Sequence, residues 1–255
     1  MRILVFIAKI IDKTVSILST IFIIILLLYS GFSIWNTHMI MNNGVVDEEL
    51  LKYKPGNKED NSDGDDELQK KINQDALIEI NKDYQSWITI FDTSIDYPVV
   101  QGKDNLEYVN KDFCGKFSVS GVPFLDHRNS AYFQDNYNLL YGHNIENEVM
   151  FGDVAKFLDE DFFNQHLMGE LYTLDKEYDI YLFASFETYA SDEYVFIPGN
   201  LKEQQMQNFL EYIKSKAVVY KDVKVNTKSK LICLSTCSNY YKNKRIVLFG
   251  KLVER

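Results

Sequence analysis

A cysteine that ends one apolar stretch and an arginine that begins the next could form a reactive pair. Cys237 closes the run Leu234-Ser235-Thr236-Cys237, and Arg245 directly precedes Ile246-Val247-Leu248-Phe249. If these two stretches pair as a β-hairpin, directly opposed residues have Cβ atoms about 5 Å apart. A guanidinium beside a thiolate can stabilise the oxyanion that forms when the sulfur attacks a carbonyl. The spacing therefore predicts a nucleophilic thiol with a cationic neighbour.

The other cysteines do not suggest a disulfide or a metal site. The chain has 3 cysteines, Cys114, Cys233 and Cys237, and an odd, small number is not a disulfide framework. Cys233 and Cys237 share one face of a strand, but at about 3.3 Å per residue they lie roughly 13 Å apart, too far for a disulfide. The Cys-x-x-Cys spacing of a zinc site is also absent. We predict that Cys233 packs in the core and that Cys237 is the exposed thiol.

A thiol becomes a useful nucleophile beside a base or a cation. The chain has 4 histidines, of which His38 is close to the apolar amino-terminal stretch and His166 lies in a polar one. His127 and His143 each come directly after a predicted strand, where a catalytic base could stand. Spacing alone does not choose between these two residues.

Short strands with few helices between them must position these groups. Segments of alternating or continuous apolar character predict strands, and apolar residues at helical spacing predict helices. Many strands and few helices favour a mainly β fold, a closed barrel of about eight strands decorated with helices. The predicted strands are 87–90, 97–100, 122–125, 137–141, 171–174, 178–186, 231–236 and 246–253, and the predicted helices are 67–80, 150–163 and 201–217.

The amino-terminal region predicts a membrane anchor. Residues 15–35 contain no charged side chain, and a helix of roughly 20 residues spans about 30 Å, the thickness of the hydrocarbon core. Basic residues such as Lys9 and Lys13 precede this segment, and acidic residues such as Asp47 and Glu48 follow it. The positive-inside rule then places the amino terminus in the cytoplasm and the remainder outside.

A cleaved signal peptide is the alternative for the same segment. Its apolar region would have about 7–15 residues and end at a small-residue cleavage site. The apolar run here is longer, and Ser30-Gly31-Phe32-Ser33 is a poor cleavage site. We therefore predict an uncleaved single-pass anchor in the cell membrane, with an extracellular catalytic domain.

This organisation divides the chain into four parts. We predict a cytoplasmic amino terminus (1–14), a transmembrane anchor (15–35), an extracytoplasmic linker (36–66) and a catalytic domain that begins with a helix (67–255). Residues 56–66 are polar and rich in Gly, Asn and Asp, as expected of a linker. The formal net charge of -10 disfavours nucleic acid as a partner, because no basic excess is present to neutralise phosphates.

Three motifs, taken in this order, resemble those of the sortases, the cysteine transpeptidases of Gram-positive bacteria. Tyr141-Gly142-His143 is similar to the sortase histidine motif, and Leu234-Ser235-Thr236-Cys237 is similar to the Leu-x-Thr-Cys strand end. Arg245 matches the arginine that opens the following strand. The segment Tyr97-Pro98-Val99-Val100-Gln101, the helix before the cysteine strand and the amino-terminal anchor are similar to those of class B. The resemblance covers roughly residues 83–253.

The resemblance implies a sortase-like β-barrel and a transpeptidase mechanism. The thiolate of Cys237 would attack a Thr-Gly-type peptide bond in the carboxyl-terminal sorting signal of a surface protein. His143, now preferred over His127, would protonate the leaving amine, and Arg245 would stabilise the oxyanion. An amine of a cell-wall precursor would resolve the thioacyl intermediate, without a metal or an organic cofactor.

The resemblance also suggests residues that bind the substrate. By position, Ser235, Tyr141 and Asn105 are similar to residues that line the class B groove. One departure is Ser238, which follows the cysteine where some family members carry an acidic residue. No role is transferred to that position.

Three other functions are alternatives to a sortase. A cysteine peptidase would use the same residues, with water taking the acyl group. An L,D-transpeptidase also orders His before Cys, but its Ser-x-Gly-Cys signature is absent. A non-enzymatic, membrane-anchored binding module would have only structural cysteines, so that Cys237 would resist alkylation and tolerate replacement by alanine.

Overall fold

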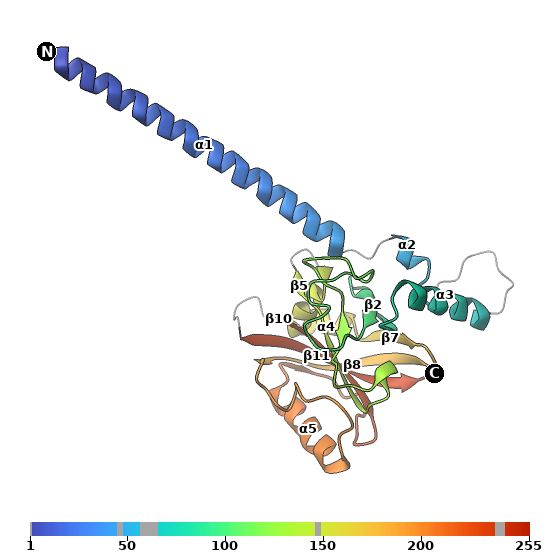
Figure 1. Ribbon diagram of the computed structural model, residues 1–255. Helices are drawn as coiled ribbons and strands as arrows, with labels where there is room; N and C mark the ends of the chain where they lie inside the picture. Colours follow the sequence, from blue (N-terminus) through green and yellow to red (C-terminus); the bar gives the residue numbers. More distant parts are fainter. Residues whose placement is uncertain (1, 45–47, 57–65, 146–148, 238–242) are drawn as a thin grey trace. The chain divides into compact units, whose positions relative to one another are not determined.

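The computed structural model (Figure 1) describes residues 2–44, 48–56, 66–145, 149–237 and 243–255. It contains two compact units, Met1–Asn42 and Asn43–Arg255. The first unit is a single helix and the second contains the β-sheet. Each unit is described separately below.

The first unit is formed by the long helix α1 (Arg2–Gly44). No proline stands in this range, so nothing in the sequence interrupts the backbone hydrogen bonds of the helix. Within it, Val5–Trp35 is long and apolar enough to cross a membrane, by length and composition. This stretch includes the predicted anchor, residues 15–35.

Eight strands of the second unit close into a barrel, as the sequence predicted. The sheet order is β11-β10-β4-β3-β2-β1-β7-β8, and pairing of β11 with β8 closes the ring. Closure leaves no exposed sheet edge among these strands. The strands are β1 (Tyr84–Ile90), β2 (Asp96–Val100), β3 (Phe124–Leu125), β4 (Tyr137–Tyr141), β7 (Met168–Thr173), β8 (Glu177–Tyr189), β10 (Lys230–Cys237) and β11 (Lys244–Glu254). The short β9 (Val219–Tyr220) pairs with β8 outside this ring.

Two of the strand pairings in the barrel are parallel. Strand β10 pairs with β4 in parallel and with β11 in antiparallel orientation. Strand β2 also pairs in parallel with β3. The carboxyl ends of β4 and β10 therefore meet at the same end of the barrel, which determines the position of the site.

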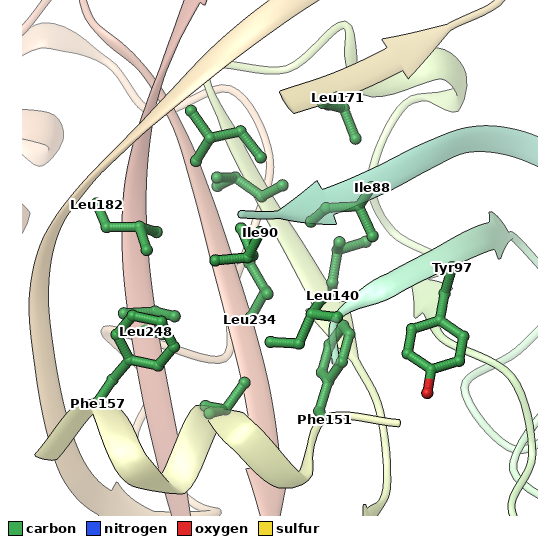
Figure 2. Packing of buried hydrophobic residues seen from close by; sticks show 14 of the residues in the cluster. Ile88, Ile90, Tyr97, Leu140, Phe151, Phe157, Leu171, Leu182, Leu234 and Leu248 are labelled. Atoms are coloured by element: carbon green, nitrogen blue, oxygen red, sulfur yellow. The ribbon is translucent and has the colours of Figure 1, made fainter. Parts of the chain in front are cut away.

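The barrel interior is filled by apolar side chains from the strands. Figure 2 shows Leu140, Leu234 and Leu248, which are fully buried and lie side by side on the inner face of β4, β10 and β11. Phe157 packs on them from the 3₁₀ helix η2 (Gly152–Leu158). Because side chains alternate along a strand, every second residue of β10 faces this core, and the others face outward.

A second core lies on the outer face of the same strands. Helix α5 (Glu203–Lys216) buries Met206, Phe209 and Ile213 in this cluster. Cys233 of β10 belongs to it and is fully buried, and burial raises the pKa of its thiol. The prediction that Cys233 packs in the core is confirmed.

The helix predicted over 67–80 is present as α3 (Asp66–Ile80). Its sequence carries apolar residues every four positions (Leu68, Ile72, Ala76 and Ile80), but this stripe does not face the core. Leu68 and Ile72 are 58% and 50% exposed, whereas Leu77 is 0% exposed and packs in a third apolar cluster. The buried members of this cluster are Leu50, Leu77, Tyr84, Trp87, Val100, Tyr108, Phe113, Val122, Phe124 and Tyr172. A spacing of four residues drifts around a helix of 3.6 residues per turn, so the stripe does not define one face. The sequence therefore predicted the helix but not which of its faces is buried.

Part of the predicted linker belongs to the second unit and packs in its apolar core. Helix α2 (Glu48–Leu51) places Leu50 in the third apolar cluster, and the Lys54 ammonium lies 2.9 Å from the Asp96 carboxylate. Burial of Leu50 explains why this segment is held to the domain. The polar residues 57–65 of the predicted linker lie outside the described residues.

The helix predicted over 150–163 is divided into two pieces. Asp159 separates η2 from α4 (Glu160–Gln165), and its carboxylate accepts a hydrogen bond from the backbone N–H of Phe162 at 2.9 Å. This side chain caps a new helix and so ends the previous one. The short elements η1 (Ala131–Phe133), β5 (Asn144–Ile145) and β6 (Val149–Met150) were not predicted.

Candidate active site

The last hairpin places Cys237 opposite Arg245. The register of β10 and β11 pairs these two residues directly, as their spacing in the sequence predicted. Opposed residues on antiparallel strands have Cα atoms about 4.5–5.5 Å apart. Residues 238–242, which include Ser238, lie outside the described residues. Cys237 is placed here by its backbone pairing, so exposure of its thiol stays a prediction.

The parallel pairing of β4 and β10 brings His143 to the same place. Tyr141 is aligned with Ser235, and the Gly142 N–H donates to the Ser235 carbonyl at 3.1 Å. The Thr236 hydroxyl donates to the Gly142 carbonyl at 2.9 Å. His143 and Cys237 are the next residues along these two paired segments. The candidate base, nucleophile and oxyanion donor thus stand on three neighbouring segments at one end of the barrel.

His127 lies farther along a strand that runs in the opposite direction. Strand β3 is antiparallel to β4, with Phe124 opposite Tyr141 and Leu125 opposite Leu140. The chain therefore moves away from the end of β4 as it approaches the exposed His127. This direction explains why two histidines that each follow a strand have different positions relative to Cys237.

His143 is half-buried and its ring contacts the long loop between β2 and β3. The imidazole Nε2 lies 2.8 Å from the backbone carbonyl oxygen of Val109. The His143 carbonyl accepts a hydrogen bond from the Phe151 N–H at 2.9 Å. Both the ring and the backbone of His143 are therefore held.

Arg245 forms no ion pair with a carboxylate in the described part of the chain. Its half-buried guanidinium donates from Nη1 to the Lys244 carbonyl at 3.1 Å. The neighbouring Lys244 ammonium lies 2.7 Å from the Glu187 carboxylate, which therefore has its own cationic partner. A guanidinium in this state can bind a developing oxyanion or a substrate carbonyl.

Tyr141 combines an apolar ring with a polar tip at this end of β4. Its ring stacks on Phe196 at a centroid distance of 6.4 Å and packs on Phe124 at 5.3 Å. Its hydroxyl donates to the Asp126 carboxylate at 3.0 Å. Burial, followed by the negative charge of Asp126, raises the pKa of Tyr141, so the phenol stays protonated.

The other two predicted substrate-binding residues are Asn105 and Ser235. Asn105 makes hydrogen bonds within the protein, and Ser235 is buried. The Asn105 amide donates to Asp126 at 2.9 Å, and its oxygen accepts from the His127 N–H at 2.9 Å. Ser235 is 1% exposed, and its hydroxyl has no hydrogen-bond partner among the described residues. A direct contact of either side chain with a substrate stays a prediction.

Asp126 joins these residues, and the sequence did not identify it. Its carboxylate is 0% exposed and accepts hydrogen bonds from Arg128 at 2.8 Å and 2.6 Å. Burial alone would raise the pKa of Asp126, but the hydrogen bonds from Arg128 and Asn105 outweigh burial and lower it. Arg128 also donates to the Phe196 carbonyl at 2.7 Å. The ion pair thus connects β3, β4 and the segment that carries Phe196.

A signal for this carboxylate was present in the sequence. Asp126 directly follows a predicted apolar strand and stands two residues before Arg128, in a segment singled out only for its histidine.

No group of three or more His, Cys, Asp or Glu side chains that could hold a metal ion occurs in the described ranges.

Known proteins are similar to this chain in sequence and in fold. No family model matches the chain. The chain is 33% identical to Sortase B of Listeria monocytogenes over 238 residues, which cover 89% of this chain and 92% of that protein.

Solved structures give the same result. The structure of a cysteine-to-serine mutant of Clostridium perfringens sortase B is similar with a TM-score of 0.74 and 30% identity, covering 81% of this chain and 96% of that one. The Staphylococcus aureus sortase B–substrate complex has a TM-score of 0.67 and 33% identity, covering 72% of this chain and 86% of that one.

The closed barrel and these relatives define a sortase, an enzyme of the cysteine transpeptidase class. Within that class, the chain belongs to the class B sortases. The resemblance inferred from the sequence motifs is confirmed.

Proposed function

We propose that this protein cleaves the carboxyl-terminal sorting signal of surface proteins and transfers the acyl group to an amine of the cell wall. The observation that carries the proposal is the direct pairing of Cys237 with Arg245, next to the parallel segment that ends in His143. No cofactor takes part, and a sulfur nucleophile, a base and an oxyanion donor are the groups that acyl transfer requires.

The reaction proceeds in two steps. The thiolate of Cys237 attacks the carbonyl carbon of the scissile bond, and Arg245 donates hydrogen bonds to the oxyanion. When the carbon–nitrogen bond breaks, His143 gives its proton to the leaving amine and a thioacyl enzyme remains. An incoming amine then attacks the thioester, loses a proton to His143 and releases the thiolate.

Complexes of similar proteins support both partners. One relative was solved as a sortase B–substrate complex. Another, 32% identical with a TM-score of 0.67, is sortase B complexed with triglycine, a peptide that has a primary amine. We propose a peptide as acyl donor and a cell-wall amine as acceptor for this protein too.

The groove for the peptide would begin at Tyr141. Its half-buried ring and the exposed Ile197 beside Phe196 offer apolar surface for a side chain of the sorting signal. Ser235 and Asn105 are proposed to bind the peptide next to it. Ser235 would use the hydroxyl that has no partner in the described residues, and Asn105 would use the second N–H of its amide.

The amino-terminal helix is proposed to anchor the enzyme in the cell membrane. Its stretch Val5–Trp35 has the necessary length and hydropathy, and the flanking charges favour a cytoplasmic amino terminus with the barrel outside. We retain residues 1–14, 15–35 and 67–255 as the cytoplasmic, transmembrane and catalytic parts. We add residues 48–56 to the catalytic part, because Leu50 packs in its third apolar cluster.

A peptide-cleavage assay with and without an amine tests this proposal. The full-length protein in detergent is incubated with a quenched fluorescent peptide library built around a Thr-Gly bond, and triglycine is added to one half. We expect cleavage together with a triglycine-ligated product detected by mass spectrometry. Cleavage that yields only the free acid would indicate a peptidase, and no cleavage of any peptide would contradict both functions.

A further inference from the structure

The contact of His143 with the loop between β2 and β3 determines which ring nitrogen can exchange a proton. The Nε2 atom lies 2.8 Å from the Val109 carbonyl oxygen. A carbonyl oxygen can only accept a hydrogen bond, so Nε2 must carry the hydrogen in this contact. In the neutral ring the basic nitrogen is then Nδ1.

We propose that the Val109 carbonyl, whose close approach the missing side chain of Gly121 permits, is a positioning group that fixes His143 as the Nε2–H tautomer and leaves Nδ1 to exchange the catalytic proton. The inference rests on the proposed function, in which His143 serves as general acid and base. Val109 and Gly121 act through the ring of His143 and do not touch the reacting atoms.

Gly121 permits the close approach of three chain segments. Its φ of +62° lies in the left-handed region, and a Cβ built on it would stand 2.6 Å from the Val109 oxygen and 2.9 Å from the Tyr108 oxygen. The same Cβ would stand 3.2 Å from Cδ2 of His143. Any larger residue must therefore displace the Val109 carbonyl or the imidazole, both of which define the hydrogen bond.

The loop presents Val109 from a fixed position. Tyr108 and Phe113 are 5% and 3% exposed and anchor the loop in the third apolar cluster. The Tyr108 hydroxyl donates to the Asp83 carboxylate at 2.6 Å, and the Asn81 amide donates to the Phe113 carbonyl at 2.7 Å. The turn between α3 and β1 thus holds the loop on both sides of Val109.

Fixing one nitrogen gives the proton a defined path. In the imidazolium both nitrogens carry hydrogen, and Nδ1–H passes its proton to the amide nitrogen as the carbon–nitrogen bond breaks. The ring stays neutral with Nε2–H on Val109, and Nδ1 then takes a proton from the amine that attacks the thioester. A ring freed from the carbonyl would populate both tautomers, and only one of them has its basic nitrogen at Nδ1.

Two glycine variants isolate this contact. Gly121→Ala introduces the clash, whereas Gly115→Ala is a matched control. Gly115 has a φ of +77°, in the same left-handed region, but no heavy atom lies within 4 Å of an added Cβ. Both variants therefore strain the backbone of the same loop, and only Gly121→Ala disturbs Val109 and His143.

The full-length protein is assayed in detergent with the best-cleaved library peptide and triglycine, and nitrogen-15 NMR of labelled histidine reports the tautomer of His143. We expect the Nε2–H tautomer in the wild type and in Gly115→Ala, and both tautomers in Gly121→Ala. Displacement of a catalytic group by about 1 Å can cost a hundredfold, so we expect kcat of Gly121→Ala to fall about 100-fold. The KM for the peptide should stay within about twofold, because the displaced group acts on the proton and not on peptide binding.

Three results would overturn the inference: an Nδ1–H tautomer in the wild type, a tautomer unchanged in Gly121→Ala, or equal kcat in the two alanine variants. If Gly121→Ala does not fold, replacing the amide bond between Val109 and Asn110 by an ester weakens the same carbonyl as an acceptor without adding an atom. Unchanged kcat in that ester protein would also overturn it. Failure of the proposed function would look different, because the wild type would then show no triglycine-ligated product even with its Nε2–H tautomer intact.

Discussion

Tyr141 of β4 and Ser235 of β10 are aligned partners in a parallel strand pair. Because the strands run in the same direction, the residues that follow each of them come to one end of the barrel. Two positions beyond this pair stand His143 and Cys237, and Arg245 is paired with Cys237 from the other side. A long-range parallel contact and a local hairpin together assemble the candidate site.

Replacing the nucleophile should abolish turnover. Cys237→Ala removes the thiol of the residue that pairs with Arg245, and we expect no thioacyl formation and loss of more than about 1,000-fold in rate. Cys114→Ser is the matched control, because that exposed residue lies in the loop between β2 and β3. The measurement is cleavage of the best library peptide. Turnover by Cys237→Ala at the rate of the control would exclude the mechanism.

Removal of the guanidinium should lower kcat/KM without unfolding the protein. Loss of one oxyanion donor costs about 100- to 1,000-fold in rate, and we expect Arg245→Ala to fall in that range with Arg245→Lys between it and the wild type. Arg255→Ala is the control, because that guanidinium binds Asp179 and Glu170. Steady-state kinetics measure kcat/KM of each variant, and thermal melts show whether the variant is folded. The role of Arg245 would be rejected if Arg245→Ala and Arg255→Ala had equal activity.

The two histidines that follow strands should differ in their importance. His143→Ala should lose about 100- to 10,000-fold in rate, the usual contribution of a positioned acid or base. His127→Ala should stay within a few-fold, because β3 carries His127 away from the end of β4. Both variants are compared under identical peptide and triglycine concentrations. The opposite ranking would transfer the acid–base role to His127.

The buried carboxylate of Asp126 should make the free energy of unfolding depend on pH. Its pKa is lowered in the folded state, so its stabilising contribution is complete above the unfolded value of about 3.9 and is lost as the pH falls through the folded value. Asp126→Asn removes charge-assisted hydrogen bonds to Arg128, each worth about 1.5–3 kcal/mol, and we expect a loss of about 2 kcal/mol at pH 7.

Urea unfolding of the wild type and of Asp126→Asn at several pH values measures this effect. The difference in the free energy of unfolding between the wild type and Asp126→Asn should become smaller below about pH 4, where Asp126 of the unfolded chain becomes protonated. If this difference in the free energy of unfolding stays constant from about pH 7 to about pH 3, the charge of Asp126 does not stabilise the fold.

Local patterns predicted the parts of the structure that depend on neighbours in the chain. Strand periodicity and the short connection from Cys237 to Arg245 were sufficient to predict their pairing, because a hairpin is a local structure. Spacing alone did not choose between His127 and His143. The resemblance to the sortases preferred His143, and the pairing of β4 with β10 gives the structural reason. These strands are far apart in the chain, and no local pattern specifies their register.

Tertiary context accounts for what the sequence did not predict. The exposed stripe of α3 and the burial of Leu77 depend on where the helix meets the third apolar cluster. Asp126 gains its role because Arg128, Asn105 and Tyr141 reach it from three segments of the chain. Such convergence leaves no periodic signal in the sequence.

Trapping the covalent intermediate tests the central claim most directly. The full-length enzyme is mixed with the best library peptide without an amine, quenched with acid, digested and analysed by mass spectrometry. We predict an acyl group on Cys237 that disappears when triglycine is added before the quench, with the triglycine conjugate appearing in equal amount. An acyl group on another residue, or turnover with no adduct on Cys237 under any quench time, would contradict the account.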